Sequence, residues 1–233
     1  MSQTEQKDTS IRSTTEFPSN GYSSTLSFRP LTYREIKRRF WHMAPGLLAF
    51  VLHVVPHADP ISLTMKIILV SLVAIIGLRV LLGFQAIQRK GEGAGVSAVG
   101  GYAISVLSTA LLFPKDLELG LAVLSILAFG DGSATLFGLL LRGPRLPWNN
   151  AKSWTGFLAF IAVGSLMTAW IYWGETHNPE AVEPSVTFGI ALALTMPAVI
   201  AAAIAESVKS RINDNVRVGV TAAVVVALLH MLR

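Results

Sequence analysis

The stretch LAVLSILAFGDGSATLFGLLL, residues 121–141, decides the fold class, because it is as long and almost as apolar as a membrane-spanning helix. Asp131 is its one charged residue. A carboxylate at such a depth costs at least about 2.5 kcal/mol without a partner or water, and buried ionisable groups in membranes are usually functional. Gly130 and Gly132 flank Asp131, and we expect them to allow a break in the helix beside a ligand. The alternative is a structural kink whose Asp pairs with a neighbouring helix.

The composition of the whole chain agrees with a membrane protein. Of the 233 residues, 52% are hydrophobic and 14% are charged, whereas a soluble domain carries roughly 25% charged residues. This composition excludes a soluble globule, a disordered chain and a fibrous repeat. The chain contains no cysteine, which excludes disulfides, Cys-ligated zinc, iron–sulfur clusters and thiol catalysis.

Seven apolar stretches predict an all-α fold, a polytopic bundle of about seven transmembrane helices. They cover residues 43–56, 62–84, 96–113, 117–141, 156–173, 186–205 and 216–232. Sixteen of the nineteen Lys and Arg residues lie in alternate loops on one side of these stretches. The positive-inside rule therefore places the N-terminus in the cytoplasm, and the net charge of +5 is explained by topology rather than by a nucleic-acid partner. We divide the chain into a polar, disordered cytosolic tail, residues 1–30, and a transmembrane domain, residues 31–233.

The predicted cytosolic loop RGPRLPWNNAKSWTG, residues 142–156, is a candidate phosphate-binding site. It combines the cations Arg142, Arg145 and Lys152 with the hydrogen-bonding side chains of Asn149 and Ser153. Cations and fixed donors on a Pro-stiffened loop suit a polyphosphate. The alternative is an ordinary positive-inside loop with a Trp at the membrane interface.

A second carboxylate occurs in IAAAIAESVKSRINDNVRVG, residues 200–219, on the same predicted side as Asp131. Glu206 follows an apolar helix, and Asp214 and Asn215 come soon after it. Two carboxylates plus phosphate oxygens are what Mg²⁺ prefers, so Glu206 is a candidate second metal ligand. The alternative is a helix-end residue that pairs with Lys209 at i,i+3.

The segment REIKRRFWHM, residues 34–43, places Arg39 and His42 at the cytosolic end of the first span, and Arg38 shares a helix face with His42. The alternative is an interfacial belt of basic and aromatic residues. Every candidate site therefore faces one side of the membrane. This arrangement suits a lipid substrate in the bilayer that meets a charged, phosphorylated substrate from water.

Taken together, these segments resemble the polyprenol kinase family, which comprises dolichol kinases, phytol kinases and CTP-dependent diacylglycerol kinases. The resemblance covers roughly residues 35–233 and rests on four motifs in the same order: RRFWH (38–42), GDGSATLFG (130–138), RLPWNNAKSWTG (145–156) and AESVKSRINDN (205–215). The more distant phosphatidate cytidylyltransferases share the GD helix and part of the loop after it.

The resemblance implies an enzyme, a CTP-dependent phosphotransferase that uses Mg²⁺ and phosphorylates a membrane lipid alcohol at the cytosolic face. The alcohol would be an isoprenoid alcohol such as phytol or dolichol, or diacylglycerol. Asp131, Lys152 and Glu206 would be catalytic, and Asp131 and Glu206 would hold the metal. The other residues carried over would bind nucleotide or phosphate: Arg39, His42, Ser153, Asp214 and Asn215. The composition of the loop adds Arg142, Arg145 and Asn149 to this set.

Two alternatives to a lipid kinase stay open. One is a phosphatidate cytidylyltransferase, which would make CDP-diacylglycerol. The other is a catalytically altered scaffold or carrier, because Thr155 stands where the family has Glu and Ala151 where it has Lys. We expect a membrane lipid and a nucleoside triphosphate as partners, no nucleic acid, a homodimer as one assembly, and a bacterial cytoplasmic membrane rather than an organelle membrane.

Overall fold

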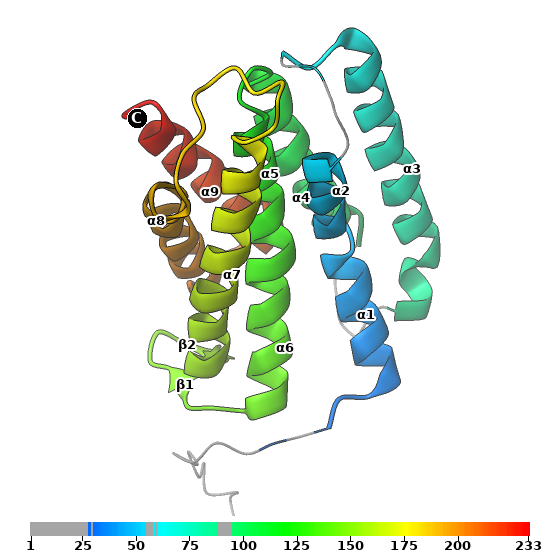
Figure 1. Ribbon diagram of the computed structural model, residues 1–233. Helices are drawn as coiled ribbons and strands as arrows, with labels where there is room; N and C mark the ends of the chain where they lie inside the picture. The colour runs from blue at the N-terminus through cyan, green and yellow to red at the C-terminus, as the bar shows by residue number, and fades with distance from the viewer. Residues whose placement is uncertain (1–27, 29, 55–57, 59, 88–94) are drawn as a thin grey trace, which may run out of the picture.

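The computed structural model describes residues 28, 30–54, 58, 60–87 and 95–233 (Figure 1). The predicted tail, residues 1–30, lies almost wholly outside the described residues. The helices are α1 (Tyr33–Met43), α2 (Gly46–Val54), α3 (Leu63–Ile87), α4 (Gly95–Leu112), α5 (Leu117–Ser125), the π-helical turn η1 (Ile126–Gly130), α6 (Asp131–Leu141), α7 (Trp154–Glu175), α8 (Phe188–Ser207) and α9 (Asp214–His230). Two short strands, β1 (Arg145–Leu146) and β2 (Asn149–Ser153), pair as an antiparallel hairpin.

The centre of the bundle is one continuous rod formed by α5, η1 and α6. Every residue of α5 and η1 is buried, which explains why this part of the sequence is apolar on all sides. Helix α7 packs on α5, η1 and α6, while α8 and α9 complete that side of the bundle (Figure 1). On the other side, α4 packs on α5 and α9, and α3 packs on α4 at the edge of the bundle. The all-α fold predicted from the sequence is confirmed.

Within the described part of the chain, three helical rods are long and apolar enough to cross a membrane by length and composition: Leu117–Leu141, Trp154–Glu175 and Phe188–Ser207. This agrees with an integral membrane protein. Each of the seven apolar stretches overlaps a helix, although the first is divided between α1 and α2 at Pro45. The count of seven spans stays a prediction.

The helix is continuous at Asp131, so the prediction of a helix break there is wrong. A single π-helical turn, η1, precedes Asp131, and the helical path continues into α6. The flanking glycines serve close packing instead. A Cβ at Gly130 would lie 2.7 Å from the Phe160 ring, and one at Gly132 would collide with the Met43 side chain. These two positions therefore let α7 and the end of α1 approach the central rod.

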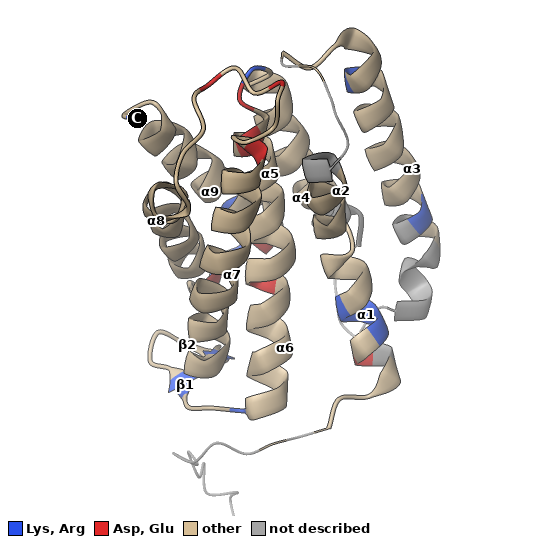
Figure 2. Ribbon diagram, in the orientation of Figure 1, with Lys and Arg blue, Asp and Glu red and all other residues tan. Residues whose placement is uncertain are grey.

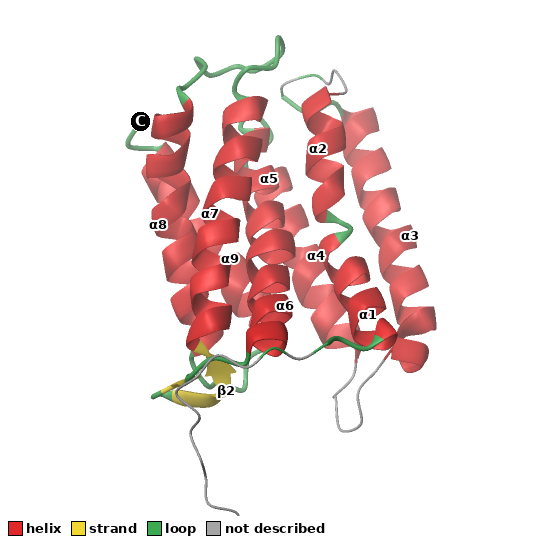
Figure 3. Ribbon diagram, turned by 60° about the horizontal axis from the view of Figure 1, so that its bottom comes forward, coloured by secondary structure: helices red, strands yellow, loops and turns green. Residues whose placement is uncertain are grey.

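The two ends of the bundle differ in charge (Figure 2). Lys and Arg gather around α1 and the hairpin, whereas acidic residues gather at the opposite end, near the start of α5. The hairpin lies across the end of α6 and α7 at the basic end, as the view in Figure 3 shows. This basic end is the one that the positive-inside rule predicts to be cytosolic.

Candidate active site

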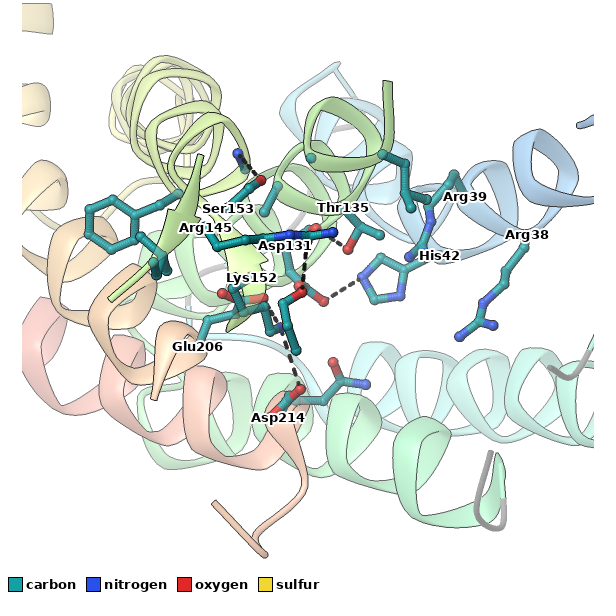
Figure 4. A pocket seen from close by; sticks show the side chains of 18 of the residues that line it. Arg38, Arg39, His42, Asp131, Thr135, Arg145, Lys152, Ser153, Glu206 and Asp214 are labelled. Carbon is teal, nitrogen blue, oxygen red and sulfur yellow. Dashed lines mark hydrogen bonds and ion pairs between the residues drawn. The ribbon is translucent and has the colours of Figure 1, made fainter. Parts of the chain in front are cut away.

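A polar cavity of about 430 Å³ extends from the basic end into the bundle. It is lined by residues of α1, α6, α7, the hairpin, the end of α8 and the start of α9 (Figure 4). Asp131 begins α6, ten residues before its last residue, Leu141. At 1.5 Å per residue, Asp131 lies about 15 Å inside that end of the helix. The cavity therefore joins the membrane surface to a carboxylate buried in the bundle.

Asp131 is held by His42 (Figure 4). His42 Nε2 lies 3.1 Å from Asp131 Oδ2 and 3.2 Å from the carbonyl oxygen of Leu127. Both neighbours are acceptors, so Nε2 carries the proton and donates to them. Only 15% of the Asp131 side chain is exposed, and the pairing offsets part of the cost of burying its charge.

The π turn leaves the Leu127 carbonyl free to accept from His42. In an α-helix the carbonyl of Leu127 would accept from the backbone N–H of Asp131. Here that N–H donates to Ile126 and Ala128 instead, which leaves the Leu127 carbonyl for His42. π turns inside α-helices occur frequently at functional sites. The backbone distortion and the buried carboxylate thus belong to one local structure that positions His42.

Lys152 is the cation at the centre of the other half of the cavity. Its ammonium group donates to the Glu206 carboxylate and lies 3.8 Å from Asp214 Oδ2. Asp214 Oδ1 in turn accepts from Arg217 at 2.6 Å. The pair does not form between Glu206 and Lys209, the alternative considered from sequence. Strand β2, helix α8 and helix α9 therefore converge on one ion-pair cluster.

The charges around Lys152 keep it protonated. Burial alone would lower the pKa of its ammonium group, but the Glu206 carboxylate, with Asp131 and Asp214, raises that pKa above its ordinary value. Lys152 is therefore a fixed positive charge at neutral pH. A fixed cation between carboxylates can bind a phosphate oxygen as soon as one enters the cavity.

The hairpin is fastened to the end of α8 by two adjacent side chains. Trp148 Nε1 donates to Ser207 Oγ at 3.0 Å, and the Asn149 amide donates to the Ser207 carbonyl at 2.9 Å. Asn149 Oδ1 also accepts from the backbone N–H of Ala151 at 3.2 Å. These bonds place Lys152, three residues after Asn149, against Glu206.

We expect Asn149→Ala to loosen the hairpin and so to misplace Lys152. Asn149 is 4% exposed, and its loss removes the donor to the buried carbonyl of Ser207, at a cost of about 1–3 kcal/mol. Limited proteolysis and hydrogen exchange should report faster opening of residues 145–153. Asn150→Ala, at the exposed neighbouring position, is the matched control. Unchanged protection in Asn149→Ala would contradict the clamp.

Most residues predicted for the site line the cavity. They are Arg39, His42, Asp131, Arg145, Lys152, Ser153, Glu206, Asp214 and Asn215. Ser153 also caps α7, since its Oγ accepts from the N–H of Gly156 at 3.2 Å. Arg142 and Asn149 do not line the cavity: Arg142 is exposed at the left-handed end of α6, and Asn149 belongs to the clamp.

Three of the polar residues that line the cavity were not among the predicted site residues: Arg38, Thr135 and Asn213. Arg38 could have been found, because it shares a helix face with His42. Thr135 lies one turn after Asp131 and donates to its backbone carbonyl at 3.3 Å. A Thr that donates back to a carbonyl one turn earlier is common in membrane helices, so no pattern marked Thr135 as a site residue.

Thr155, which stands where the family has Glu, lies outside the lining of the cavity. Its Oγ1 accepts from the N–H of Gly143 at 3.4 Å and contacts Ser153 Oγ at 2.9 Å. A Cβ at Gly143 would collide with the Thr155 side chain. Thr155 therefore joins the chain after α6 to the start of α7.

A second group of ionisable side chains lies at the opposite, acidic end. Single ligand atoms of Asp116, Glu118 and His230 lie within 4.8 Å of one another. Arg233 lies 4.0 Å from Glu118, and the Tyr172 hydroxyl lies 2.7 Å from His230 Nδ1. The group is an ion-pair network that connects α5, α7 and the end of α9.

Comparison with known proteins gives partial matches. The chain is 30% identical over 135 residues to a probable chloroplastic phytol kinase of Triticum aestivum, covering 55% of this chain and 42% of that protein. It is 27% identical over 162 residues to phytol kinase 1 of Arabidopsis thaliana (61% and 51%), and 28% identical over 131 residues to farnesol kinase of the same plant (55% and 41%). Over part of its length, the chain is thus similar to phytol and farnesol kinases. No family model and no solved structure matches the chain.

The resemblance to the polyprenol kinases stated from the motifs is confirmed. The chain spans about half the length of the relatives named here. These polyprenol kinases are named as chloroplastic plant proteins, so they give no support for the predicted bacterial cytoplasmic membrane.

Proposed function

We propose that this protein is a kinase of an isoprenoid alcohol, which transfers the γ-phosphoryl group of a nucleoside triphosphate, CTP by resemblance, to the alcohol at the cytosolic face. One observation carries this proposal. The half-buried Asp131–His42 pair and the Lys152–Glu206–Asp214 cluster line a single cavity that opens at the basic end of the bundle. A lipid hydroxyl from the membrane and a triphosphate from water can meet in such a cavity. The kinase names of the relatives support the same reaction class.

The basic residues of the cavity would hold the triphosphate. Arg38 and Arg39 come from α1, whereas Arg145 and Lys152 come from the hairpin on the opposite side. Cations on two sides of a phosphate chain fix its direction and stabilise the charge that spreads over the transferred group. Positioning and charge stabilisation are the main contributions of a protein to phosphoryl transfer.

Asp131 would orient the attacking hydroxyl and accept its proton. In the reaction the alcohol oxygen forms a bond to the γ-phosphorus, the bond from that phosphorus to the β,γ-bridging oxygen breaks, and the nucleoside diphosphate leaves. The proton of the alcohol passes to the Asp131 carboxylate. His42 Nε2 holds that carboxylate in place, because its N–H donates to Oδ2.

The donor set of the cavity fits Mg²⁺. Asp131, Glu206 and Asp214 offer hard carboxylate oxygens in one cavity, which together with phosphate oxygens is the ligand set of this ion. Asp131 and Glu206 are the pair that we propose as its protein ligands. When bound, the ion would neutralise phosphate charge, which lowers the barrier to transfer.

Labelled nucleotide tests the proposal directly. Purified protein is incubated with phytol or farnesol in detergent, Mg²⁺, and CTP labelled at either the γ- or the α-phosphate. We expect γ label, and not α label, to enter the lipid product, because a kinase transfers only the terminal group. A parallel reaction with labelled ATP decides whether cytidine is preferred.

Each other outcome has a distinct meaning. Entry of α label with phosphatidate as acceptor would establish a cytidylyltransferase and contradict the kinase. No transfer to isoprenoid alcohols, diacylglycerol or phosphatidate would favour the scaffold or carrier. The Asp131→Asn variant, assayed in parallel, gives the background level of label in the lipid for each reaction.

A further inference from the structure

An apolar groove of about 330 Å³ adjoins the polar cavity. It runs between α2, α3, α4 and α5, and its walls include Leu48, Leu72, Val73, Ala103, Val106 and Leu121. Among the described residues, the polar ones that line it are Arg38, His42, Tyr102 and Asn215, together with Trp41. An apolar groove of this kind suits a hydrocarbon chain and gives a charged ligand no partner along most of its length.

The groove and the polar cavity meet at His42. Arg38, His42 and Asn215 line both of them. The groove also extends along the central rod as far as Leu117, fourteen residues before Asp131. That separation is about 21 Å at 1.5 Å per residue, more than the roughly 15 Å of one hydrocarbon leaflet. A chain in this groove would therefore end beside the Asp131–His42 pair.

Tyr102 lies beside His42, where the groove meets the polar cavity. Its ring packs edge-on against His42, with centroids 5.7 Å apart, and it lines the groove. Its buried hydroxyl has no hydrogen-bond partner among the residues that the structure describes. Buried hydroxyl groups are nearly always paired, and an unpaired one calls for an explanation such as a missing ligand. An alcohol whose hydroxyl reached this point would supply that partner.

We propose that the isoprenoid chain of the alcohol lies in this groove, and that the Tyr102 hydroxyl hydrogen-bonds the reacting hydroxyl where the groove meets the polar cavity. The inference rests on the proposed kinase function. It assigns α3 and α4 to chain recognition and makes Tyr102 a substrate-binding residue. Exposed Ile76 and half-buried Leu72 border the groove on α3, so a lipid can enter from the membrane side.

A bulky residue in the groove should change chain-length selectivity. We expect Val73→Trp to lower kcat/KM for phytol, a C20 alcohol, at least tenfold relative to geraniol, a C10 alcohol, because the longer chain needs the obstructed part of the groove. Ala74→Trp makes the same change at the next position of α3, which is exposed and outside the groove lining, and should leave the ratio unchanged. An unaltered ratio in Val73→Trp would overturn the groove assignment.

Tyr102→Phe tests the hydroxyl contact, because it keeps the ring against His42. Loss of one hydrogen bond predicts a fall of about 3- to 10-fold in kcat/KM for the alcohol. The KM for the nucleotide should not change. An equal effect on both substrates, or none on the alcohol, would overturn the role of Tyr102.

A binding measurement separates this inference from the kinase proposal. A photoreactive diazirine analogue of farnesol should label peptides of α3 or α4 in wild-type protein, and excess phytol should prevent the labelling. Labelling without transfer would support the groove and refute the kinase. Transfer to phytol with labelling confined to helices that do not line the groove, such as α7 or α8, would refute the groove and support the kinase.

Discussion

Replacing Asp131 by Asn should lower kcat/KM for the lipid alcohol by about 10³-fold, within the 10²- to 10⁴-fold range of acid–base contributions. The change removes the negative charge and the proton acceptor. It keeps an oxygen that can accept from His42 Nε2, so the fold should survive. Circular dichroism and the melting temperature in detergent would verify this. Initial rates of transfer from labelled CTP to phytol or farnesol would measure the loss.

Asp116→Asn is the matched control for this variant. Asp116 lies at the opposite end of the bundle, 3.6 Å from His230, and outside the cavity lining. We expect its rates to equal those of the wild type. Full transfer activity in a folded Asp131→Asn protein would contradict the assignment of the whole site, since every other proposed role is built around this carboxylate.

The sequence was sufficient to find Asp131, because a charged residue within an apolar stretch costs free energy in a membrane and is therefore usually functional. The π turn before it could not be predicted. Its function is to leave the Leu127 carbonyl for His42, which lies 85 positions earlier in the chain, and no local sequence pattern records a contact at that separation. The role of Tyr102 could not be predicted either, since the sequence of an apolar helix does not show whether the hydroxyl of a Tyr has a partner in the folded protein.

The loop after α6 shows a different limit of sequence analysis. Its cations suggested phosphate binding, and Arg145 and Lys152 do line the cavity. The same composition also suggested Asn149, whose amide instead fastens the hairpin to Ser207. Residue type cannot separate a side chain that binds a ligand from one that positions its neighbours. That distinction depends on which way each strand residue faces, and this was set by pairing with β1.

Lys152→Met should have two separable effects, on stability and on activity. It leaves Glu206, whose side chain is 6% exposed, without its cation. Breaking a buried pair in this way costs about 3–5 kcal/mol. We expect a loss near the lower limit, because Lys152 itself is 31% exposed and water partly screens the pair. Transfer should fall by about 10²- to 10³-fold, the usual effect of removing one charge-stabilising group.

Adding Glu206→Gln to Lys152→Met separates the two effects. The double variant has no unpaired buried carboxylate at this position, so the free energy of unfolding should recover most of its loss. Activity should stay low, because neither the phosphate-binding cation nor the carboxylate proposed for the metal is restored. Lys209→Met removes an exposed Lys outside the cavity lining and should change neither quantity. Recovery of activity in the double variant would mean that Lys152 serves only to neutralise Glu206, and that the triphosphate is held by the arginines of α1 and the hairpin alone.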